Sequence, residues 1–314
     1  MAVVVRAYRG DDESALLALW AAALPYDAVD ADTFRRKVLL DPNFRAEGLA
    51  VAEEDGRLLG FCLGLVRHLP FEGVGLDPDR GWITAMGVQP ARRREGIGTA
   101  LLAQVNSYLL ANGRATLVVA GYLPNYFVPG VDIERYADGV AFLQHRGFET
   151  VSEALSMDAN LVRFDFAPYQ ARAAALAERG VTIRALAPAD IPPFLDFLRD
   201  QMPADWVRHA REQLTEATRG RGRYEQFSLA LRGPEIVGYC QFEDEHFGPF
   251  GVRDDHQGQG IGTVLLAHSL ETMRRHGHHN AWVLWTSQHT ADHVYGRFGF
   301  ALSRRFAILR RTVS

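Results

Sequence analysis

Hydrophobic and polar positions along the chain describe two successive series of strands and helices in the same order. In the first half, apolar stretches such as VVVRAY, LAVAEE and LLGFCLGLV predict strands, and Asp55-Gly56 between the last two is typical of a hairpin turn. The stretch WITAMGV predicts a further strand, and Leu101, Val105 and Leu109 then recur at helical spacing. The second half repeats this order from VTIRAL through FSLALRGPEIVGYCQF and HFGPFGV to a helix and the strand AWVLW.

Constant spacings between landmark residues indicate that the two series are copies of one unit. A first group recurs with its internal spacing unchanged: Arg6, Gly60 and Cys62 correspond to Arg184, Gly238 and Cys240. So does a second group, in which Gly96, Gly98 and Gly113 correspond to Gly260, Gly262 and Gly277. The glycines of the two late Gly-Phe pairs, Gly147 and Gly299, correspond in turn. The difference in residue number between corresponding positions falls from each group to the next. The first half therefore carries insertions between the matching groups, as expected for loops on a shared scaffold.

An internal duplication in a chain of 314 residues predicts two domains, each large enough to bury its own core. We place them at residues 1–164 and 181–314, joined by an Ala-rich linker helix over residues 165–180. The fold class is α/β (α+β), because antiparallel hairpins come first in each half and a strand, a loop and a helix follow. Pro249, inside the strand before the second loop, lacks a ladder donor and predicts a bulge or a splayed edge there.

Composition and charge exclude several classes of function. The net charge of −4 offers no general attraction to nucleic acid, and no uncharged run reaches the roughly 18 residues that a membrane span requires. We therefore expect a cytoplasmic protein, a monomer or homodimer, with no nucleic-acid or membrane partner. The two cysteines, Cys62 and Cys240, lie at equivalent points of apolar strands and are expected to be core residues. The histidines lack a third partner at metal-binding spacing, so no metal site is predicted.

Each half carries a glycine-rich loop between a strand and a helix, with the sequences REGIGTALL from Arg94 and GQGIGTVLL from Gly258. Glycines let consecutive backbone N–H groups converge, and the helix N-terminus adds partial positive charge, so such a loop suits a diphosphate. A Walker loop would need a lysine directly after the last glycine, where threonine stands in both copies. A dinucleotide-binding loop would need a third glycine three residues after the second, where Leu101 and Leu265 stand. Both of these loop types are therefore set aside.

The two loops resemble the acyl-CoA loop of the GNAT N-acetyltransferases. The resemblance is carried by the patterns R-x-x-G-x-G from Arg93 and Q-x-x-G-x-G from Gln257, each after a strand and before a Leu-rich helix, and by the later segments HRGFE and VYGRFGF. It covers essentially both halves. It implies two tandem GNAT-like acyl-CoA N-acyltransferase domains, each a mixed, mostly antiparallel sheet with a splayed central strand and flanking helices.

The resemblance also implies acetyl-CoA (coenzyme A) as the cofactor, bound at equivalent residues of the halves. Val88 and Val252, the last residues of the splayed strands, are expected to pair with the cofactor arm. The loop residues are expected to contact its phosphates: Arg93, Arg94, Glu95, Gly96, Ile97, Gly98 and Thr99 in the first half, and Gln257, Gly258, Gln259, Gly260, Ile261, Gly262 and Thr263 in the second.

Candidate catalytic residues lie mainly in the second half. The family commonly uses a tyrosine four residues before the glycine of Gly-Phe to protonate the departing thiolate, and Tyr295 stands at that position. The first half has Leu143 there, so catalysis is expected in the second half, with Tyr136 as the alternative acid of the first half. An attacking amine must first lose a proton, and Glu243 and Glu245, which lead into the strand HFGPFGV, are the candidate bases.

These observations favour an N-acetyltransferase that moves an acetyl group from acetyl-CoA to the primary amine of a small molecule by direct attack. Two alternatives stay open at this point. One is a non-catalytic, acetyl-CoA-binding regulatory tandem module, favoured for the first half by the missing tyrosine. The other is acetylation of a protein terminus or lysine, which the sequence does not separate from a small-molecule reaction.

Overall fold

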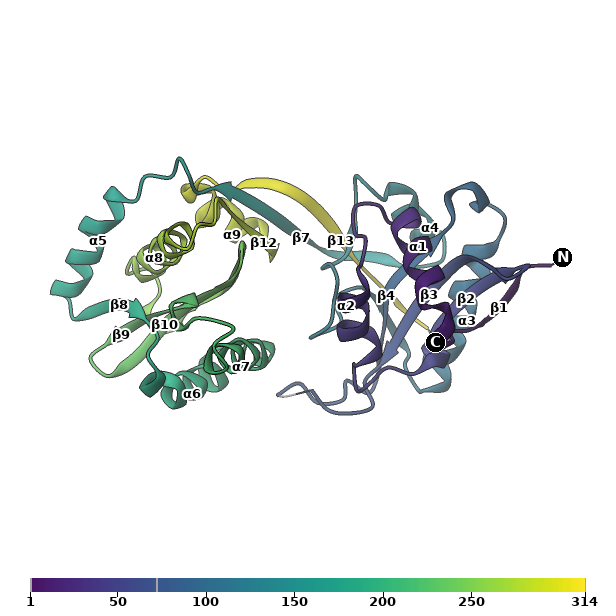
Figure 1. Ribbon diagram of the computed structural model, residues 1–314, viewed down its shortest axis with the longest axis horizontal. Helices are drawn as coiled ribbons and strands as arrows, with labels where there is room; N and C mark the ends of the chain where they lie inside the picture. The colour runs from purple at the N-terminus through teal and green to yellow at the C-terminus, as the bar shows by residue number, and fades with distance from the viewer. Residues whose placement is uncertain (1, 72, 314) are drawn as a thin grey trace. The chain divides into compact units, whose positions relative to one another are not determined.

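The computed structural model describes residues 2–71 and 73–313, and it divides the chain into two compact units (Figure 1). Unit 1 consists of the residues up to Ala154 together with those from Arg305 on, and unit 2 is Leu155–Arg304. This division differs from the ranges 1–164 and 181–314 expected from the sequence. The difference arises because the C-terminal strand belongs to the unit formed by the first half of the chain.

Unit 1 is built on a sheet with the strand order β1-β2-β3-β4-β5-β13. Its strands are β1 (Val4–Ala7), β2 (Leu49–Glu54), β3 (Arg57–Val66), β4 (Arg80–Val88), β5 (Thr116–Val119), the short β6 (Val131–Asp132), and the later part of β13 (Ala301–Thr312). β7 (Glu149–Asn160) begins in this unit. Its helices are α1 (Glu13–Ala23), α2 (Ala31–Phe34), continued by a π-helical turn (Arg35–Leu39), α3 (Ile97–Ala111) and α4 (Ala137–Gln144).

Hydrophobic cores cover both faces of the unit 1 sheet. On one face, Leu101, Val105 and Leu109 of α3 are fully buried, which confirms the helical stripe predicted from their spacing. On the other face, Trp20 of α1 stacks on Phe61 of β3 with ring centroids 4.7 Å apart. Unit 1 therefore has helices on both sides of a mixed sheet, the arrangement expected from the order of its elements.

Unit 2 repeats this architecture with the strand order β8-β9-β10-β11-β12-β7. Its strands are β8 (Val181–Ala185), β9 (Phe227–Arg232), β10 (Glu235–Glu243), β11 (His246–Val252), β12 (Asn280–Thr286) and the part of β7 from Leu155 on. Its helices are α5 (Ala167–Glu178), α6 (Ile191–Gln201), α7 (Ala204–Thr218), α8 (Ile261–Arg275) and α9 (Gln288–His293).

The helices of unit 2 lie on both faces of its sheet. Figure 1 shows α8 on one side of β10 and α6 and α7 on the other. Helix α7 is amphipathic, with Val207, Ala210, Leu214 and Ala217 buried at helical spacing. Helix α5 was expected to be a linker, yet it packs against α8 and β8, and its Leu176 is buried in the unit 2 core. The segment 165–180 is therefore part of unit 2.

An ion pair recurs at the same place in both units. Arg6 contacts Asp12 at 2.7 Å in unit 1, and Arg184 contacts Asp190 at 2.6 Å in unit 2. The hydrogen bond from the arginine lowers the pKa of each aspartate. The two aspartates correspond at the same offset as the two arginines, so the duplication seen in the glycines extends to the start of each unit.

The strand before each glycine loop is splayed away from its parallel neighbour. In unit 1, β4 pairs with β5 only from Arg80 to Ile83, and in unit 2 the register of β11 on β12 is the single pair His246 and Trp282. Both strands also carry an irregularity opposite the preceding strand, which in β11 falls at Gly248 and Pro249. The splayed central strand expected in each domain is confirmed, and it leaves the later backbone groups of β4 and β11 facing a gap between strands.

The C-terminal strand completes the sheet of unit 1. Residues Leu309 and Thr312 of β13 pair antiparallel with Val119 and Thr116 of β5. The strand at the equivalent position of unit 2 is β7, whose Met157 pairs with Val283 of β12. The two halves of the chain have therefore exchanged their last strands.

Replacing Leu309 by alanine is expected to lower the free energy of unfolding of unit 1 by about 2 to 5 kcal/mol, because the side chain is 0% exposed in that unit's core. Urea unfolding measures the loss, and hydrogen exchange locates it, with reduced protection in β5. Leu302→Ala, on the same strand but 50% exposed, is the control and should change stability by less than about 0.5 kcal/mol. Loss of protection in β12 instead of β5 would contradict the placement of this part of β13 in the sheet of unit 1.

Candidate active site

The two glycine loops have the same backbone conformation. Each starts with a short 3-10 turn, continues through a residue with positive φ, Arg94 (φ 69°) or Gly258 (φ 73°), and ends on a glycine with positive φ at the helix N-cap. These N-cap glycines are Gly96 (φ 84°) and Gly260 (φ 83°), and a side chain added at either would meet no atom within 4 Å. The loops are therefore open on this side and shaped as the sequence predicted.

The first turn of each helix presents backbone N–H groups without a cap. In α3 the first α-helical bond runs from Ala100 N to Gly96 O, and in α8 from Val264 N to Gly260 O. No side chain caps either helix among the residues that the structure describes. The amides of the preceding three residues in each helix therefore have no partner inside the helix, and together with the helix dipole they suit an anion. This open amide cradle fits a diphosphate.

The polar side chains at the start of each loop hold the loop to the strand. The Arg93 guanidinium donates to Val88 O at 3.4 Å and to Ala23 O at 3.2 Å. At the equivalent position, Gln257 Nε2 donates to Val252 O at 3.0 Å. Both side chains thus fix the last carbonyl of the splayed strand. Phosphate contacts proposed for these two loops therefore rest on the backbone amides that follow Arg93 and Gln257.

The arginines beside the first loop are engaged in ion pairs within unit 1. Arg92 contacts Glu54 at 2.7 Å and Glu95 at 2.8 Å, and Arg94 lies 3.8 Å from Asp138. Of the loop residues expected to contact phosphate, Glu95 thus pairs with Arg92, while Arg94 remains largely exposed to solvent. The loop's positive charge is consequently smaller than the run of three arginines suggests.

Side chains of α4 and the turn after it lie over the first loop. The ring of Phe142 would be 3.4 Å from a Cβ added at Gly98, and the Arg146 guanidinium lies 3.7 Å from the centroid of that ring. Arg146 also donates to the Thr99 hydroxyl. Unit 2 has Phe298 at the place of Arg146, directly before the glycine of Gly-Phe, and this side chain is buried beside Tyr169. Sequence reasoning missed Arg146, although aligning the two Gly-Phe pairs would have matched it to Phe298.

Tyr295 lies against the start of the splayed strand in unit 2. It opens the 3-10 turn Tyr295–Phe298, is 7% exposed, and packs on Phe247 of β11 and Phe300 with ring centroids 6.1 Å and 5.2 Å away. Burial raises the pKa of its phenol, so the hydroxyl keeps its proton at neutral pH. In unit 1 the same position is occupied by Leu143, which is buried in the core and has no proton to give.

The two candidate carboxylates lie in the hairpin turn between β10 and β11. Glu243 ends β10 and is exposed, and it pairs in register with His246 of β11. Glu245 Oε1 accepts hydrogen bonds from His279 N at 3.3 Å and Asn280 N at 3.1 Å, so it fixes the start of β12. The structure thus places both carboxylates beside the first residue of β11, at the other end of that strand from Val252. Of the two, Glu245 accepts the backbone hydrogen bonds from His279 and Asn280, and Glu243 does not.

Other candidate groups of the sequence have different surroundings. Cys62 and Cys240 are both buried with free thiols, and burial raises the pKa of each, so neither is a thiolate nucleophile at neutral pH. Within residues 2–71 and 73–313, no three histidine, cysteine, aspartate or glutamate side chains gather as a metal site would require.

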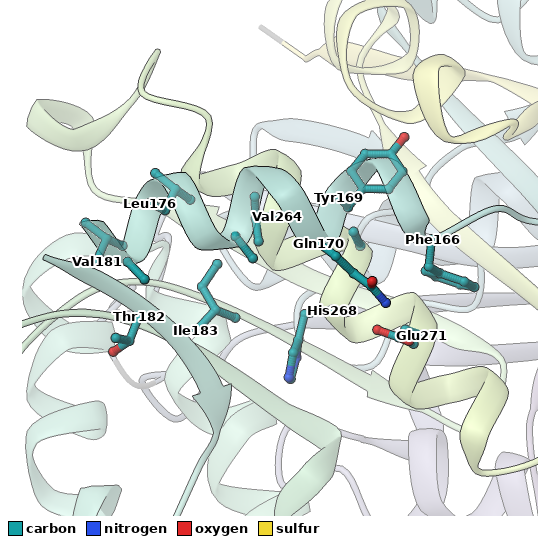
Figure 2. A pocket seen from close by; sticks show the side chains of 13 residues that line it. Phe166, Tyr169, Gln170, Leu176, Val181, Thr182, Ile183, Val264, His268 and Glu271 are labelled. Carbon is teal, nitrogen blue, oxygen red and sulfur yellow. The ribbon is translucent and has the colours of Figure 1, made fainter. Parts of the chain in front are cut away.

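A separate pocket of about 240 Å³ lies in unit 2 between α5, β8 and α8 (Figure 2). Its walls are mainly apolar, and the polar residues among them include Gln170, His268 and Glu271. His268 Nδ1 lies 2.9 Å from the Ser228 hydroxyl. The described residues that line this pocket include none of the loop 257–263, so it is distinct from the amide cradle.

Comparisons with known proteins agree with this geometry. The model of the acetyltransferase (GNAT) family matches residues 15–125 and again residues 191–300. An acetyltransferase of Pectobacterium atrosepticum is 30% identical over 112 residues, which cover 35% of this chain and 69% of that protein. None of the helices in the described part of the chain is both long enough and apolar enough to cross a membrane.

Two solved structures share the fold. A tandem GNAT protein from the clavulanic acid biosynthesis pathway has a TM-score of 0.66 and 17% identity, covering 100% of this chain and 99% of that one. A GCN5-related glucosamine N-acetyltransferase region of a fungal multi-domain β-N-acetylglucosaminidase has a TM-score of 0.79 and 17% identity, and the match covers 98% of this chain and 38% of that larger protein. Because the family model matches in both halves, the chain belongs to the GNAT family of acetyltransferases and carries its domain twice.

Proposed function

We propose that unit 2 transfers the acetyl group of acetyl-CoA to the primary amine of a small molecule. The observation that carries this proposal is the position of Tyr295, a protonated phenol packed against the splayed strand that leads into an open amide cradle. Unit 1 has the cradle and the splayed strand but has leucine in place of the tyrosine. The GNAT family generally uses acetyl-CoA, which supplies the activated acetyl thioester.

Each part of the site has a distinct task in this reaction. The amides from Gly258 to Thr263 bind the diphosphate. The backbone of β11 from Phe247 to Val252, which lies beyond the one pair with β12, binds the cofactor arm as an added strand would. Glu243, with Glu245 beside it in the turn, accepts the proton that the acceptor ammonium must lose before attack. Tyr295 holds at its phenol oxygen the proton that the departing thiolate takes up.

We infer a second task for unit 1, cofactor binding without turnover. Leu143 cannot donate a proton, and Phe142 and Arg146 lie over the first loop. The guanidinium of Arg146, which donates to the Thr99 hydroxyl in the first turn of α3, is suited to a phosphate oxygen. Acetyl-CoA bound at Arg93 to Thr99, with Val88 against its arm, would make unit 1 a sensing or stabilising module.

Purified protein mixed with acetyl-CoA and a panel of amines is expected to release free thiol with at least one of them, and mass spectrometry should find the acetylated amine. Calorimetric titration with acetyl-CoA gives the number of binding sites. Binding at two sites without turnover of any amine would favour the regulatory function for both units. Turnover of peptides but not of small amines would favour protein acetylation.

A further inference from the structure

A row of polar side chains in unit 2 occupies positions that are apolar in unit 1. Tyr239, Gln241 and Glu243 alternate along β10, on the face that α7 covers. Their counterparts in β3, at the offset that relates Gly238 to Gly60, are Phe61, Leu63 and Leu65, which are buried in the core beneath α1. The same fold is thus complete with apolar residues at all three positions, so the polar row of unit 2 is not required by the architecture.

Two members of this polar row are buried without hydrogen bonds. Tyr239 and Gln241 are 0% exposed, and within the described part of the chain neither the Tyr239 hydroxyl nor either polar atom of the Gln241 amide has a partner. A buried polar group left unpaired destabilises a fold by about 1 to 3 kcal/mol. A buried amide that the fold does not need therefore points to a ligand that satisfies it.

Helix α7 places titratable groups over the polar row. Trp206 packs on the ring of Tyr239 at 5.8 Å between centroids, and the carboxylate of the preceding Asp205 acts electrostatically on Tyr239. Burial raises the pKa of Asp205 and lowers that of His209, on whose pKa the Glu243 carboxylate acts in the opposite direction. His209 is therefore neutral at pH 7. Burial disfavours the charged form of the Asp205 carboxyl group, and a cationic ligand beside it would offset that cost.

The register of β10 on β11 places Gln241 beside the irregular stretch of the splayed strand. Cys240 pairs with Phe250 and Phe242 with Phe247, so Gln241 lies opposite the irregularity at Gly248 and Pro249. Phe247, directly before this irregularity, carries the ring contact with Tyr295. Phe247 and Tyr295 belong to the core on the α8 face of the sheet, whereas Tyr239 belongs to the core on the α7 face. The polar row and the proposed acid therefore lie on opposite faces at the same point of β11.

We propose that Tyr239, Gln241 and Asp205 bind the acceptor, and that the acceptor is a small hydrophilic amine with a further cationic or hydroxyl group. This inference rests on the proposed function of unit 2 and names its substrate class. The Gln241 amide offers one donor and one acceptor side, the Tyr239 hydroxyl a donor, and Asp205 a partner for positive charge. Because α7 covers these atoms, the acceptor can bind them only when α7 moves.

The test gives unit 2 the residues of unit 1. Gln241→Leu and Tyr239→Phe are compared with wild type using spermidine and glucosamine as hydrophilic amines and phenethylamine as an apolar one. Each variant is expected to lose at least tenfold in kcat/KM for the two hydrophilic amines, mainly through KM, and less than twofold for phenethylamine. Affinity for acetyl-CoA stays unchanged, and the melting temperature stays equal or rises. Gln170→Leu, in the separate pocket of Figure 2, is the matched control and leaves all values unchanged.

The failure of this inference differs from the failure of the proposed function. If wild type turns over an amine and both variants keep its KM, the acceptor site is overturned and the proposed function stands. A lower melting temperature of the variants with unchanged kinetics also overturns the acceptor site, because it shows a structural role for these side chains. If wild type releases no thiol with any amine, the proposed function fails. In that case, calorimetric titration of spermidine in the presence of coenzyme A tests the acceptor site by itself. Spermidine binding that is tenfold weaker to Gln241→Leu than to wild type supports the site, and equal binding to both, or no binding to wild type, overturns it.

Discussion

Replacing Tyr295 by phenylalanine is expected to lower kcat about 100-fold, because the phenol would no longer supply a proton to the departing thiolate. The ring would still pack on Phe247 and Phe300, so the fold and the affinity for acetyl-CoA should be unchanged. Steady-state thiol release measures kcat, and calorimetry measures cofactor affinity. Since burial raises the pKa of Tyr295, wild-type kcat should not fall on the alkaline side at the ordinary tyrosine value of about 10.

The control for this variant is Tyr224→Phe, which also removes one tyrosine hydroxyl from unit 2 but lies in a short turn before β9. It should retain wild-type kcat. A Tyr295→Phe enzyme with full activity would assign the proton to another group, and a variant that lost cofactor affinity along with kcat would point to a binding role for the hydroxyl.

Introducing aspartate into the amide cradle is the second change with a large expected effect. Gly262→Asp should weaken acetyl-CoA binding to unit 2 at least 100-fold, because a carboxylate within about 4 Å of a phosphate is repelled by about 4 kcal/mol in a partly screened site. The carboxylate in the first turn of α8 is favourable to the helix dipole, but its Cβ would lie 3.1 Å from the Phe250 ring, so a loss of stability similar to that of Gly262→Ala is expected. Calorimetry and thermal unfolding together separate the two effects.

Two matched variants complete this experiment. Gly262→Ala adds a Cβ that touches the Phe250 ring at 3.1 Å but no charge, and it should cost far less affinity than aspartate. Gly98→Asp makes the same change in unit 1. If both units bind cofactor, each aspartate variant should remove one of two sites, with turnover lost only for Gly262→Asp. Loss of turnover with Gly98→Asp alone would place the reaction in unit 1.

Much of the fold was predictable because the two halves keep the same spacings. The strand, glycine loop and helix of each half were expected from local patterns, and the positive φ at Gly96 and Gly260 is what such glycines permit. The splay next to Pro249 also followed from its missing N–H group. Local sequence determines these features, and local patterns therefore predict them.

The features that were not predicted depend on tertiary partners. The alternation in β13 indicates a strand but does not say which sheet receives Leu309, since any apolar face of suitable width would bury it. Helix α5 was expected to be a linker because its sequence is Ala-rich, and nothing local in that sequence shows that the helix packs on α8. The run of arginines from Arg92 to Arg94 indicates positive charge beside the first loop, but Glu54, far away in the sequence, pairs with Arg92.

The polar row of unit 2 was also overlooked, although the sequence contained its signal. The stretch FSLALRGPEIVGYCQF has the appearance of a buried hairpin, and a single glutamine inside it attracts little notice. Aligning the two copies on Gly60 and Gly238 sets Gln241 against Leu63 and Tyr239 against Phe61. Differences between repeats that share a fold thus indicate function more directly than either repeat does alone.

The pairing of β5 with β13 has a consequence for synthesis on the ribosome. Val119 emerges long before its partner Leu309, and translation of the intervening stretch takes roughly 10 to 40 seconds at typical rates. Throughout that interval the nascent first unit has an open strand edge, which is a template for aggregation or for the wrong strand. Protection of this edge, by a chaperone or by transient use of the β7 segment, would be part of the biogenesis of the protein. Expressing the first half of the gene alone would leave that edge without its β13 partner.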